Sequence, residues 1–447
     1  MNSYSSYQNI SDGWIDKIPK HWGTIKTKYV SEFRNGFSYK SDEWKEVGIP
    51  VIRMSNIGED GKLKITNKNL KYVSSESYEN TKNYLIKKND ILISMTDMNP
   101  LMLWLGSTII FDSDELYLQN QRVGNIRITD QNVNSKFYHY MSNTDIVRNQ
   151  LKVSVYPNVQ TNLSTEPIKN EVFPLPPLPE QTQIVSFLDN KTQKIDKLIE
   201  KTEQKIKLLK EKRTSLINHC VTKGLNPNVD MKDSGVEWIG EIPSHWDKTK
   251  LSYYCEVKDG THDTPSYVDD GGIPLVTQKD ITKGKLDFSK TKNISYKDYE
   301  QINVRSNVMK GDIIMSMIGS IGNPTIVEVD TPFSIKNVCL FKSSESQENI
   351  KFIHYLLSSN ILDVELNYNS RGGVQGFVSL DVLRNLLYLK PPIDEQTQIV
   401  EYLDEQTQRI DSTIEKETQR IELLKEYRQS LISEVVTGKV DVRDYNG

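Results

Sequence analysis

Four short clusters of amide and cationic side chains could hydrogen-bond to the edges of nucleic-acid bases. In the major groove Arg and Lys match guanine, whereas Asn and Gln match adenine. The first half of the chain offers Arg53-Met54-Ser55-Asn56 and Gln119-Asn120-Gln121-Arg122, and the second half offers Gln278-Lys279 and a Gly-rich stretch from Arg371 to Gln375. A solvated surface position is the alternative for each side chain. The candidate contact residues are Arg53, Asn56, Gln121, Arg122, Gln278, Lys279, Arg371 and Gln375.

The sequence lacks the motifs that would give it chemistry of its own. It contains no Gly-x-x-x-x-Gly-Lys-Ser/Thr phosphate loop, no Gly-x-Gly-x-x-Gly turn after a strand and no His-Glu-x-x-His pair. Asn99-Pro100 and Asn323-Pro324 are not followed by Pro and an aromatic residue, so they do not form the base-holding motif of an amino-methyltransferase and indicate turns. We therefore predict a protein that is not an enzyme and holds no cofactor or metal.

Composition indicates a soluble chain that acts inside the cell. Of the 447 residues, 36% are hydrophobic and 26% charged, and no run of eighteen apolar residues could span a membrane. No secretion signal is evident, and three scattered cysteines favour a reducing, cytoplasmic location. The net charge of -4 lacks the basic excess common in nucleic-acid binders, so any DNA-binding surface must be local.

The chain is two copies of one unit. Residues 180–222 and 395–437 are identical at more than half of their positions, and both begin Glu-Gln-Thr-Gln-Ile-Val. An opening motif, Trp14 to Trp22, recurs as Trp238 to Trp246, and we expect it to attach the start of each domain to a helix. His21 and His139 match His245 and His354 in the repeat, which favours packed or capping histidines over metal ligands. The unit thus comprises an opening motif, a mixed domain and a long helix.

Each mixed domain is predicted to be α+β. Runs of β-branched residues bounded by Gly, Asn and Asp indicate strands, and a short amphipathic helix is expected near residues 137–151 and again near 352–366. The predicted strands are Val51–Ile57, Ile91–Thr96, Thr108–Phe111 and Val123–Ile128 in the first copy, and Leu275–Ile281, Ile313–Met317, Thr325–Val329 and Val338–Phe341 in the second.

Both long helices carry a heptad seam, which predicts a coiled coil. Neither helix could bury its seam alone. The central seam residues are Leu188, Ile195, Ile199, Ile206 and Leu209 in the first helix, and Leu403, Ile410, Ile414, Ile421 and Leu424 in the second.

Charge indicates which helices pair. The first has nine Lys or Arg against six Asp or Glu, whereas the second has five against ten. Two copies of the same helix would repel, and one of each would attract. We predict an intramolecular antiparallel pair, each helix being about 42 residues and ~60 Å long. Homodimerisation through the helices is the alternative.

Several motifs together resemble the specificity subunit of type I restriction–modification systems. The two Pro-rich segments Leu175–Val185 and Lys390–Val400 are typical of that family, as are the joint Asp233–Pro243 and the C-terminal Val436–Asp441. Lys258-Asp259-Gly260-Thr261-His262-Asp263-Thr264-Pro265 is similar to a loop that recurs early in its target-recognition domains. In the first domain Glu32–Ser38 occupies that place without the Gly-Thr-His sequence. The resemblance covers nearly the whole chain.

The resemblance implies a DNA-reading role shared with catalytic partners. Each target-recognition domain would read half of a bipartite, asymmetric site in double-stranded DNA, with Thr261 and His262 added to the candidate contacts. The helix pair would set the spacer and dock two methyltransferase subunits, which would carry S-adenosylmethionine, while restriction subunits would cut. The implied domains are 1–175 and 236–390, with helices at 176–222 and 391–437, a linker at 223–235 and a tail at 438–447.

Two other functions are compatible with parts of this pattern. A coiled-coil scaffold that binds only proteins would explain the helices. A self-contained enzyme, a fused modification–restriction protein, would need motifs that the sequence lacks. The chain is not expected to form homo-oligomers on its own or to contact membranes.

Overall fold

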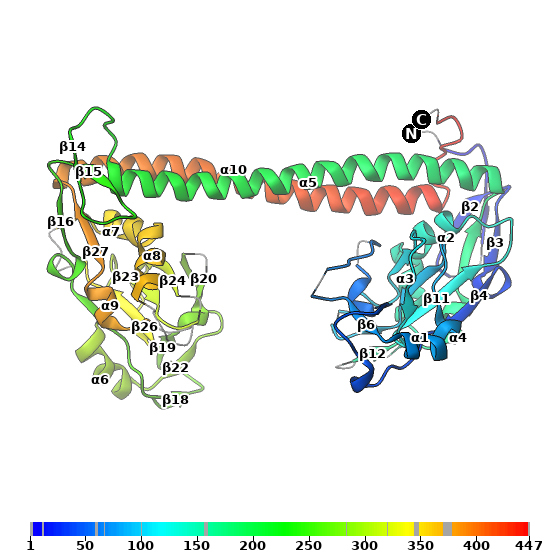
Figure 1. Ribbon diagram of the computed structural model, residues 1–447, viewed down its shortest axis with the longest axis horizontal. Coiled ribbons are helices and arrows are strands. Elements are labelled where there is room, and N and C mark those ends of the chain that lie inside the picture. The colour runs from blue at the N-terminus through cyan, green and yellow to red at the C-terminus, as the bar shows by residue number, and fades with distance from the viewer. Residues whose placement is uncertain are drawn as a thin grey trace. The chain divides into compact units, whose positions relative to one another are not determined.

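The computed structural model describes residues 3–10, 13–58, 61–66, 68–99, 101–155, 160–282, 284–319, 321–343, 348–369 and 378–445. The chain divides into two compact units, each drawing on both long helices (Figure 1). Unit 1 comprises Met1–Thr202 and Arg420–Gly447, and unit 2 comprises Glu203–Gln419. No helix among the described residues is both long and apolar enough to cross a bilayer.

Unit 1 is built on two small sheets. A four-stranded antiparallel sheet has the order β4-β11-β7-β9, and a three-stranded sheet has the order β10-β5-β6, in which β10 runs parallel to β5. The strands of these sheets are β4 (Ser31–Asn35), β5 (Ile49–Ile52), β6 (Lys71–Val73), β7 (Ile91–Ser94), β9 (Thr108–Ile110), β10 (Leu118–Gln119) and β11 (Val123–Ile128). Further pairs join β1 (Tyr7–Asn9) to β2 (Lys17–Pro19), β3 (Gly23–Lys26) to β13 (Val172–Leu175), and β8 (Thr96–Asp97) to β12 (Thr161–Asn162).

Unit 2 repeats this plan. Its antiparallel sheet has the order β17-β26-β23-β24, and its second sheet, β18-β22-β19-β25, pairs β19 with β25 in parallel. The strands are β17 (Val257–Asp259), β18 (Tyr267–Val268), β19 (Ile273–Val276), β22 (Lys292–Ile294), β23 (Ile313–Ser316), β24 (Gly322–Ile326), β25 (Ser334–Ile335) and β26 (Val338–Phe341). Shorter pairs are β14 (Met231–Asp233) with β15 (Glu241–Pro243), β16 (Asp247–Lys250) with β27 (Leu387–Lys390), and β20 (Ile281–Thr282) with β21 (Lys285–Leu286).

Both units confirm the predicted α+β class, but several predicted strands are too long or shifted. The strand predicted at Thr325–Val329 is observed at Gly322–Ile326. Two further strands end before the polar candidates. β5 ends at Ile52 and is followed by a 3-10 turn, Met54–Asn56, and β19 ends at Val276 before the equivalent turn Gln278–Asp280. In each case the third residue of the turn, Asn56 or Asp280, turns its side chain back to accept a backbone N–H before the turn. The polar candidates after each strand therefore lie on a turn.

The single helix predicted after the last sheet strand is two helices in each unit. In unit 1, α2 (Ser135–Ser142) is followed by α3 (Asp145–Lys152), and Thr144 starts the second by accepting the backbone N–H of Val147. Unit 2 has α7 (Ile350–Leu357) and α8 (Asn360–Asn369). The prediction of one helix was wrong because a hydroxyl that caps a new helix interrupts the apolar periodicity. The other short helices are α1 (Ser75–Thr81), α4 (Thr165–Asn170), α6 (Tyr296–Ser306) and α9 (Leu380–Arg384).

The two long helices pair antiparallel, as predicted. They are α5 (Leu178–Lys223) and α10 (Ile393–Val436), which lie side by side in Figure 1. In unit 1 the Arg428 guanidinium lies 3.1 Å from Asp196. In unit 2 Lys205 and Arg213 lie 2.5 and 3.0 Å from Glu417 and Asp411, so rising numbers on α5 meet falling numbers on α10.

Burial follows the heptad seam. Leu188, Ile195, Leu403, Ile410 and Ile421 are buried. The other seam candidates are half-buried: Ile199, Ile206, Leu209, Ile414 and Leu424. Burial at these positions agrees with a seam between the two helices.

The opening motif attaches each domain to the first turn of a long helix, as expected from the repeat. In unit 1, Glu180 accepts a hydrogen bond from the Trp22 indole (3.1 Å) and lies 2.8 Å from Nε2 of His21. In unit 2 the Trp246 indole donates to Glu395 (3.0 Å), and His245 lies 2.8 Å from the same carboxylate. The repeated Trp, His and Glu thus form one clamp, made twice.

The glutamine after each clamp glutamate extends the attachment. Gln181 accepts the backbone N–H of Asn134, the residue that caps α2, at 2.8 Å. Gln396 accepts the backbone N–H of Asn349, which caps α7, at 3.0 Å. The Glu-Gln pair at the head of each long helix therefore fixes both the opening motif and the helix that follows the sheet.

Candidate nucleic-acid interface

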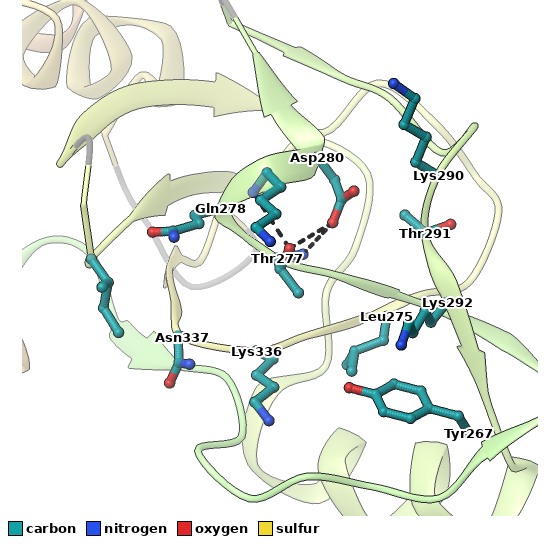
Figure 2. Close-up of a pocket in the computed structure, with 12 residues that line it drawn as sticks. Tyr267, Leu275, Thr277, Gln278, Asp280, Lys290, Thr291, Lys292, Lys336 and Asn337 are labelled. Carbon is teal, nitrogen blue, oxygen red and sulfur yellow. Dashed lines mark hydrogen bonds between the residues drawn. The ribbon is translucent and has the colours of Figure 1, made fainter. Parts of the chain in front are cut away.

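A cavity of about 470 Å³ in unit 2 is lined by four lysines (Figure 2). β19, β22, the turn after β19 and the segment between β25 and β26 supply its walls. The lining residues are Tyr267, Leu275, Thr277, Gln278, Lys279, Asp280, Lys290, Thr291, Lys292, Ile318, Lys336 and Asn337. The predicted pair Gln278 and Lys279 thus opens onto a shared hollow, together with lysines from other strands.

The positive charge of this cavity is not neutralised by the carboxylate beside it. Asp280 is buried, and its Oδ2 accepts hydrogen bonds from the backbone N–H and the hydroxyl of Thr277, both at 2.8 Å. Lys336 donates to the Thr264 hydroxyl (2.8 Å), and the Lys292 ammonium lies 4.8 Å from the Tyr267 ring centroid. Within the described part of the chain, none of the four lysines has a carboxylate at ion-pair distance. Such an arrangement suits phosphate oxygens.

Two amide side chains in the cavity can serve base edges. The Oε1 atom of Gln278 is buried and accepts no hydrogen bond from a described residue. Asn337 follows Lys336 in a left-handed backbone conformation, with φ of 54°, which turns the chain sharply between β25 and β26. Both side chains line the cavity beside the lysines.

The Gly-Thr-His loop packs directly against this segment. A Cβ on Gly260 would lie 2.1 Å from the carbonyl oxygen of Ile335, so only glycine allows the approach. Thr261 then forms a parallel bridge with Lys336. In unit 1, a Cβ on Gly36 would likewise lie 2.1 Å from the carbonyl oxygen of Asn120. The loop therefore holds the segment that carries Lys336 and Asn337.

Both ring nitrogens of His262 face acceptor oxygens. Nδ1 lies 2.9 Å from Oδ1 of Asn337, and Nε2 lies 2.8 Å from Oδ2 of Asp259. Because a ring nitrogen donates only when it carries a proton, the imidazolium form satisfies both contacts. These hydrogen bonds raise the pKa of His262 above 6.5, although partial burial and the nearby Arg305 oppose the shift. His262 thus adds positive charge beside the lysines and fixes Asn337.

Unit 1 has a larger and less charged cavity, of about 710 Å³. Met54 and Ser55 line it at the repeat positions of Gln278 and Lys279, so the two cavities occupy corresponding places in the two domains. Its lining residues are Met54, Ser55, Ile57, Gly58, Lys64, Asp97, Met98, Asn99 and Trp104. This lining contains one lysine, Lys64, whereas the lining of the unit 2 cavity contains four.

Comparison with known proteins places these cavities in a DNA-specificity domain. The sequence model of the type I restriction modification DNA specificity domain matches residues 19–208 and again 243–425. The chain belongs to this family. It is 26% identical to the EcoBI type I restriction enzyme specificity subunit of Escherichia coli over 97% of the chain and 89% of that protein. It is 24% identical to the MjaVIII specificity subunit of Methanocaldococcus jannaschii, covering 96% of the chain and 95% of that protein.

A solved structure shares the fold. A chain from a study of complex assembly and conformational transition of the type I R-M system superposes with a TM-score of 0.67 at 16% identity, covering 95% of this chain and 99% of that one. This likeness supports the arrangement of two specificity domains with a pair of long helices. The specificity domains of this chain therefore have the architecture expected from the repeat.

The candidates of the first specificity domain are more enclosed than the sequence implied. The Arg53 guanidinium donates to the carbonyl oxygen of Asn69 (2.8 Å) and lies 5.9 Å from the Trp44 ring, and burial lowers its pKa. Asn56 is fully buried and holds the turn after β5, accepting the N–H of Arg53 and donating to Lys64. Asn56 presents no accessible face to a base, so its role in this structure is to shape the turn.

The second cluster of the first domain lies where Lys336 and Asn337 lie in the second. Gln121 is exposed, whereas Arg122 is half-buried. The Arg122 guanidinium lies 3.3 Å from the side-chain oxygen of Asn162 and 3.4 Å from the Thr96 hydroxyl. Gln121 is thus the more accessible of the two. Arg371 and Gln375, predicted for the second domain, lie outside the described residues.

Sequence reasoning missed several residues of the lysine cavity, namely Tyr267, Lys290, Lys292, Lys336 and Asn337. A signal for two of them was available. The cluster Gln119 to Arg122 precedes β11 as Lys336 and Asn337 precede β26. Asn120 bridges Phe37 as Lys336 bridges Thr261, and the backbone N–H groups of Gln121 and Asn337 donate to those same two residues. The remaining three lie on β18, on β22 or just before β22, and only the fold brings them to the turn after β19.

We expect DNA binding by the second specificity domain to weaken as the pH rises through the raised pKa of His262. The imidazolium is present below that pKa and is lost above it, so one positive charge leaves the surface. His262→Gln should remove this pH dependence and lower the salt slope of binding by about one or less. Binding isotherms across pH test the prediction, with His219→Gln, an exposed histidine on α5, as the matched control. An unchanged pH profile in His262→Gln would contradict it.

Proposed function

We propose that this chain is the non-catalytic DNA-reading subunit of a type I restriction–modification complex, in which each specificity domain contacts one half of a bipartite, asymmetric site in double-stranded DNA. The lysine cavity of unit 2 carries the proposal. It gathers four lysines, none of which has a carboxylate of a described residue at ion-pair distance, in a chain whose net charge is -4. Such a group is the local positive surface that DNA binding requires. Amides beside the lysines supply base-reading groups.

The different cavities of the two domains support an asymmetric site. The unit 2 cavity combines lysines with Gln278 and Asn337, whereas the unit 1 cavity includes the large apolar side chains Met54, Met98 and Trp104. Groups of such different chemistry would favour different base sequences. The cofactor S-adenosylmethionine would belong to two methyltransferase subunits, and cutting to restriction subunits, in a cytoplasmic assembly acting on cellular DNA.

The methyltransferase subunits would dock on the outer faces of the long helices. The seam residues are used in the helix pair, but Leu208 on α5 is 63% exposed and Leu423, its repeat equivalent on α10, is 64% exposed. An apolar residue repeated on the outward face of both helices suits two copies of one partner. The alternative, a scaffold that binds proteins only, leaves the lysine cavity without a role.

Selection of binding sites from a random DNA pool tests the proposed function. The full chain, assembled with its methyltransferase partners, is expected to enrich one sequence made of two unlike half-sites separated by a fixed spacer. Gln278→Ala should relax or alter preference in one half only. Recovery of no common sequence, with stable partner binding, would instead support the scaffold.

Lengthening both long helices should change the spacer and leave the half-sites unchanged. Three heptads inserted between Lys205 and Arg213 of α5, and three between Asp411 and Glu417 of α10, keep the seam in register within unit 2. Twenty-one residues add about 31 Å to a helix at 1.5 Å per residue, which is close to one DNA turn of roughly 34 Å. We expect the selected spacer to grow by about 9 base pairs. A spacer that does not change would show that the helices do not set it.

A further inference from the structure

Unit 1 exposes a group of large apolar side chains beside its cavity. In the connection between β8 and β9, Met98 is 67% exposed and Leu101 is 72% exposed, while Leu103 and Trp104 are more than one-third exposed. We call Met98, Leu101, Leu103 and Trp104 the apolar loop. Side chains of this size gathered at one place on a surface usually mark a contact with another molecule.

The backbone of the apolar loop is held in place by polar contacts. The buried carboxylate of Asp97 accepts the backbone N–H groups of Asn99 (2.7 Å), Trp104 (2.6 Å) and Leu105 (3.1 Å). Arg148 donates to the carbonyl oxygen of Leu103. A loop fixed in this way pays little ordering entropy when it meets a ligand. These hydrogen bonds fix the backbone, and the apolar side chains of the loop point outward from it.

The position of the apolar loop points to DNA as the ligand. Met98 and Trp104 line the same cavity as Met54 and Ser55, which correspond in the repeat to Gln278 and Lys279 of the lysine cavity. The apolar loop therefore stands on the surface that the proposed function assigns to DNA, and Lys64 lines the same cavity. In unit 2 the corresponding connection between β23 and β24 is much shorter, comprising residues 317–321.

We propose that the apolar loop inserts into the first half-site as a wedge, separating one base step and stacking Trp104 against an exposed base. This inference rests on the proposed function. Leu, Met and similar side chains separate base steps in proteins that bend DNA, and an indole ring stacks on any base. Unit 2, in which the proposed function assigns lysines to phosphates, has no comparable group of exposed apolar side chains among its described residues. The wedge would therefore distort one half-site only.

Permanganate reactivity of thymines measures the wedge directly, because unstacked thymines react. The DNA is the site selected with the wild-type complex, and reactivity is measured at the thymines of both strands within and beside the first half-site. We expect a reactive step that disappears in Leu101→Ser with Trp104→Ala, together with a 10- to 100-fold loss of affinity. The methyltransferase subunits could themselves unstack bases when they act on the target adenine. Reactivity from that source would persist in this variant, which distinguishes it from reactivity caused by the wedge.

A matched control replaces Tyr29 and Val153 with alanine. These are exposed apolar residues of the same unit outside the apolar loop, and the control should keep both reactivity and affinity. Equal reactivity and affinity in the loop variant and the wild type would overturn the wedge. Loss of methyltransferase binding with DNA contacts intact would also overturn it and would make the loop a protein-docking surface. Failure of the wild-type complex to select any site would refute the proposed function itself.

Discussion

Replacing Lys279 and Lys336 with alanine is expected to weaken binding of the complex to its site on the order of 30-fold at physiological salt. Both ammonium groups line the unit 2 cavity, on the turn after β19 and on the segment between β25 and β26. Each phosphate contact contributes about 0.9 to the slope of log affinity against log salt. We therefore expect the slope to fall by roughly two, and isotherms at several salt concentrations measure it.

The control for this double variant must remove the same charge from the same unit. Lys232 and Lys250 are exposed on β14 and β16, near the opening motif of unit 2, and do not line the cavity. Their double alanine variant should change the slope by much less than one. A slope that falls equally in both variants would mean that the chain responds to net charge, and the lysine cavity would lose its special role.

The repeat predicted the architecture well because its signals are local and physical. A seam at heptad spacing together with opposite net charges was sufficient to predict an antiparallel intramolecular pair, and the structure shows it in each unit. The repeated Trp, His and Glu predicted an attachment, and Trp22 with Glu180 and Trp246 with Glu395 make it. When both copies of a repeat use the same residues for the same contact, those residues recur at matching positions and can be recognised from one sequence.

The binding surface was harder to predict because it is where the two copies differ. Asn56 has the composition of a base-reading residue, yet it is buried and shapes a turn, since an amide suits both tasks. Lys290 and Lys292 gave no signal, because surface lysines are common and only strand pairing brings β22 beside β19. From the sequence alone, Leu101 and Trp104 could equally be core residues. Their exposure becomes evident only from the loop structure around Asp97.

Trp246→Ala is expected to destabilise unit 2 by about 3–5 kcal/mol. The indole is fully buried in the core of that unit, and its N–H donates to Glu395 at the head of α10. Truncation removes the apolar packing and one donor to the carboxylate, while His245 still lies 2.8 Å from it.

Denaturant unfolding of the full chain measures this loss. Trp238→Ala serves as the control, since Trp238 belongs to the same opening motif but is only half-buried, and it should cost much less. Trp22→Ala, the repeat equivalent, should instead destabilise unit 1. Because the clamp joins a domain to its helix, the Trp246 variant should also weaken reading of the second half-site while the first is still read. Equal losses from Trp246→Ala and Trp238→Ala would show that the motif contributes ordinary packing rather than a clamp.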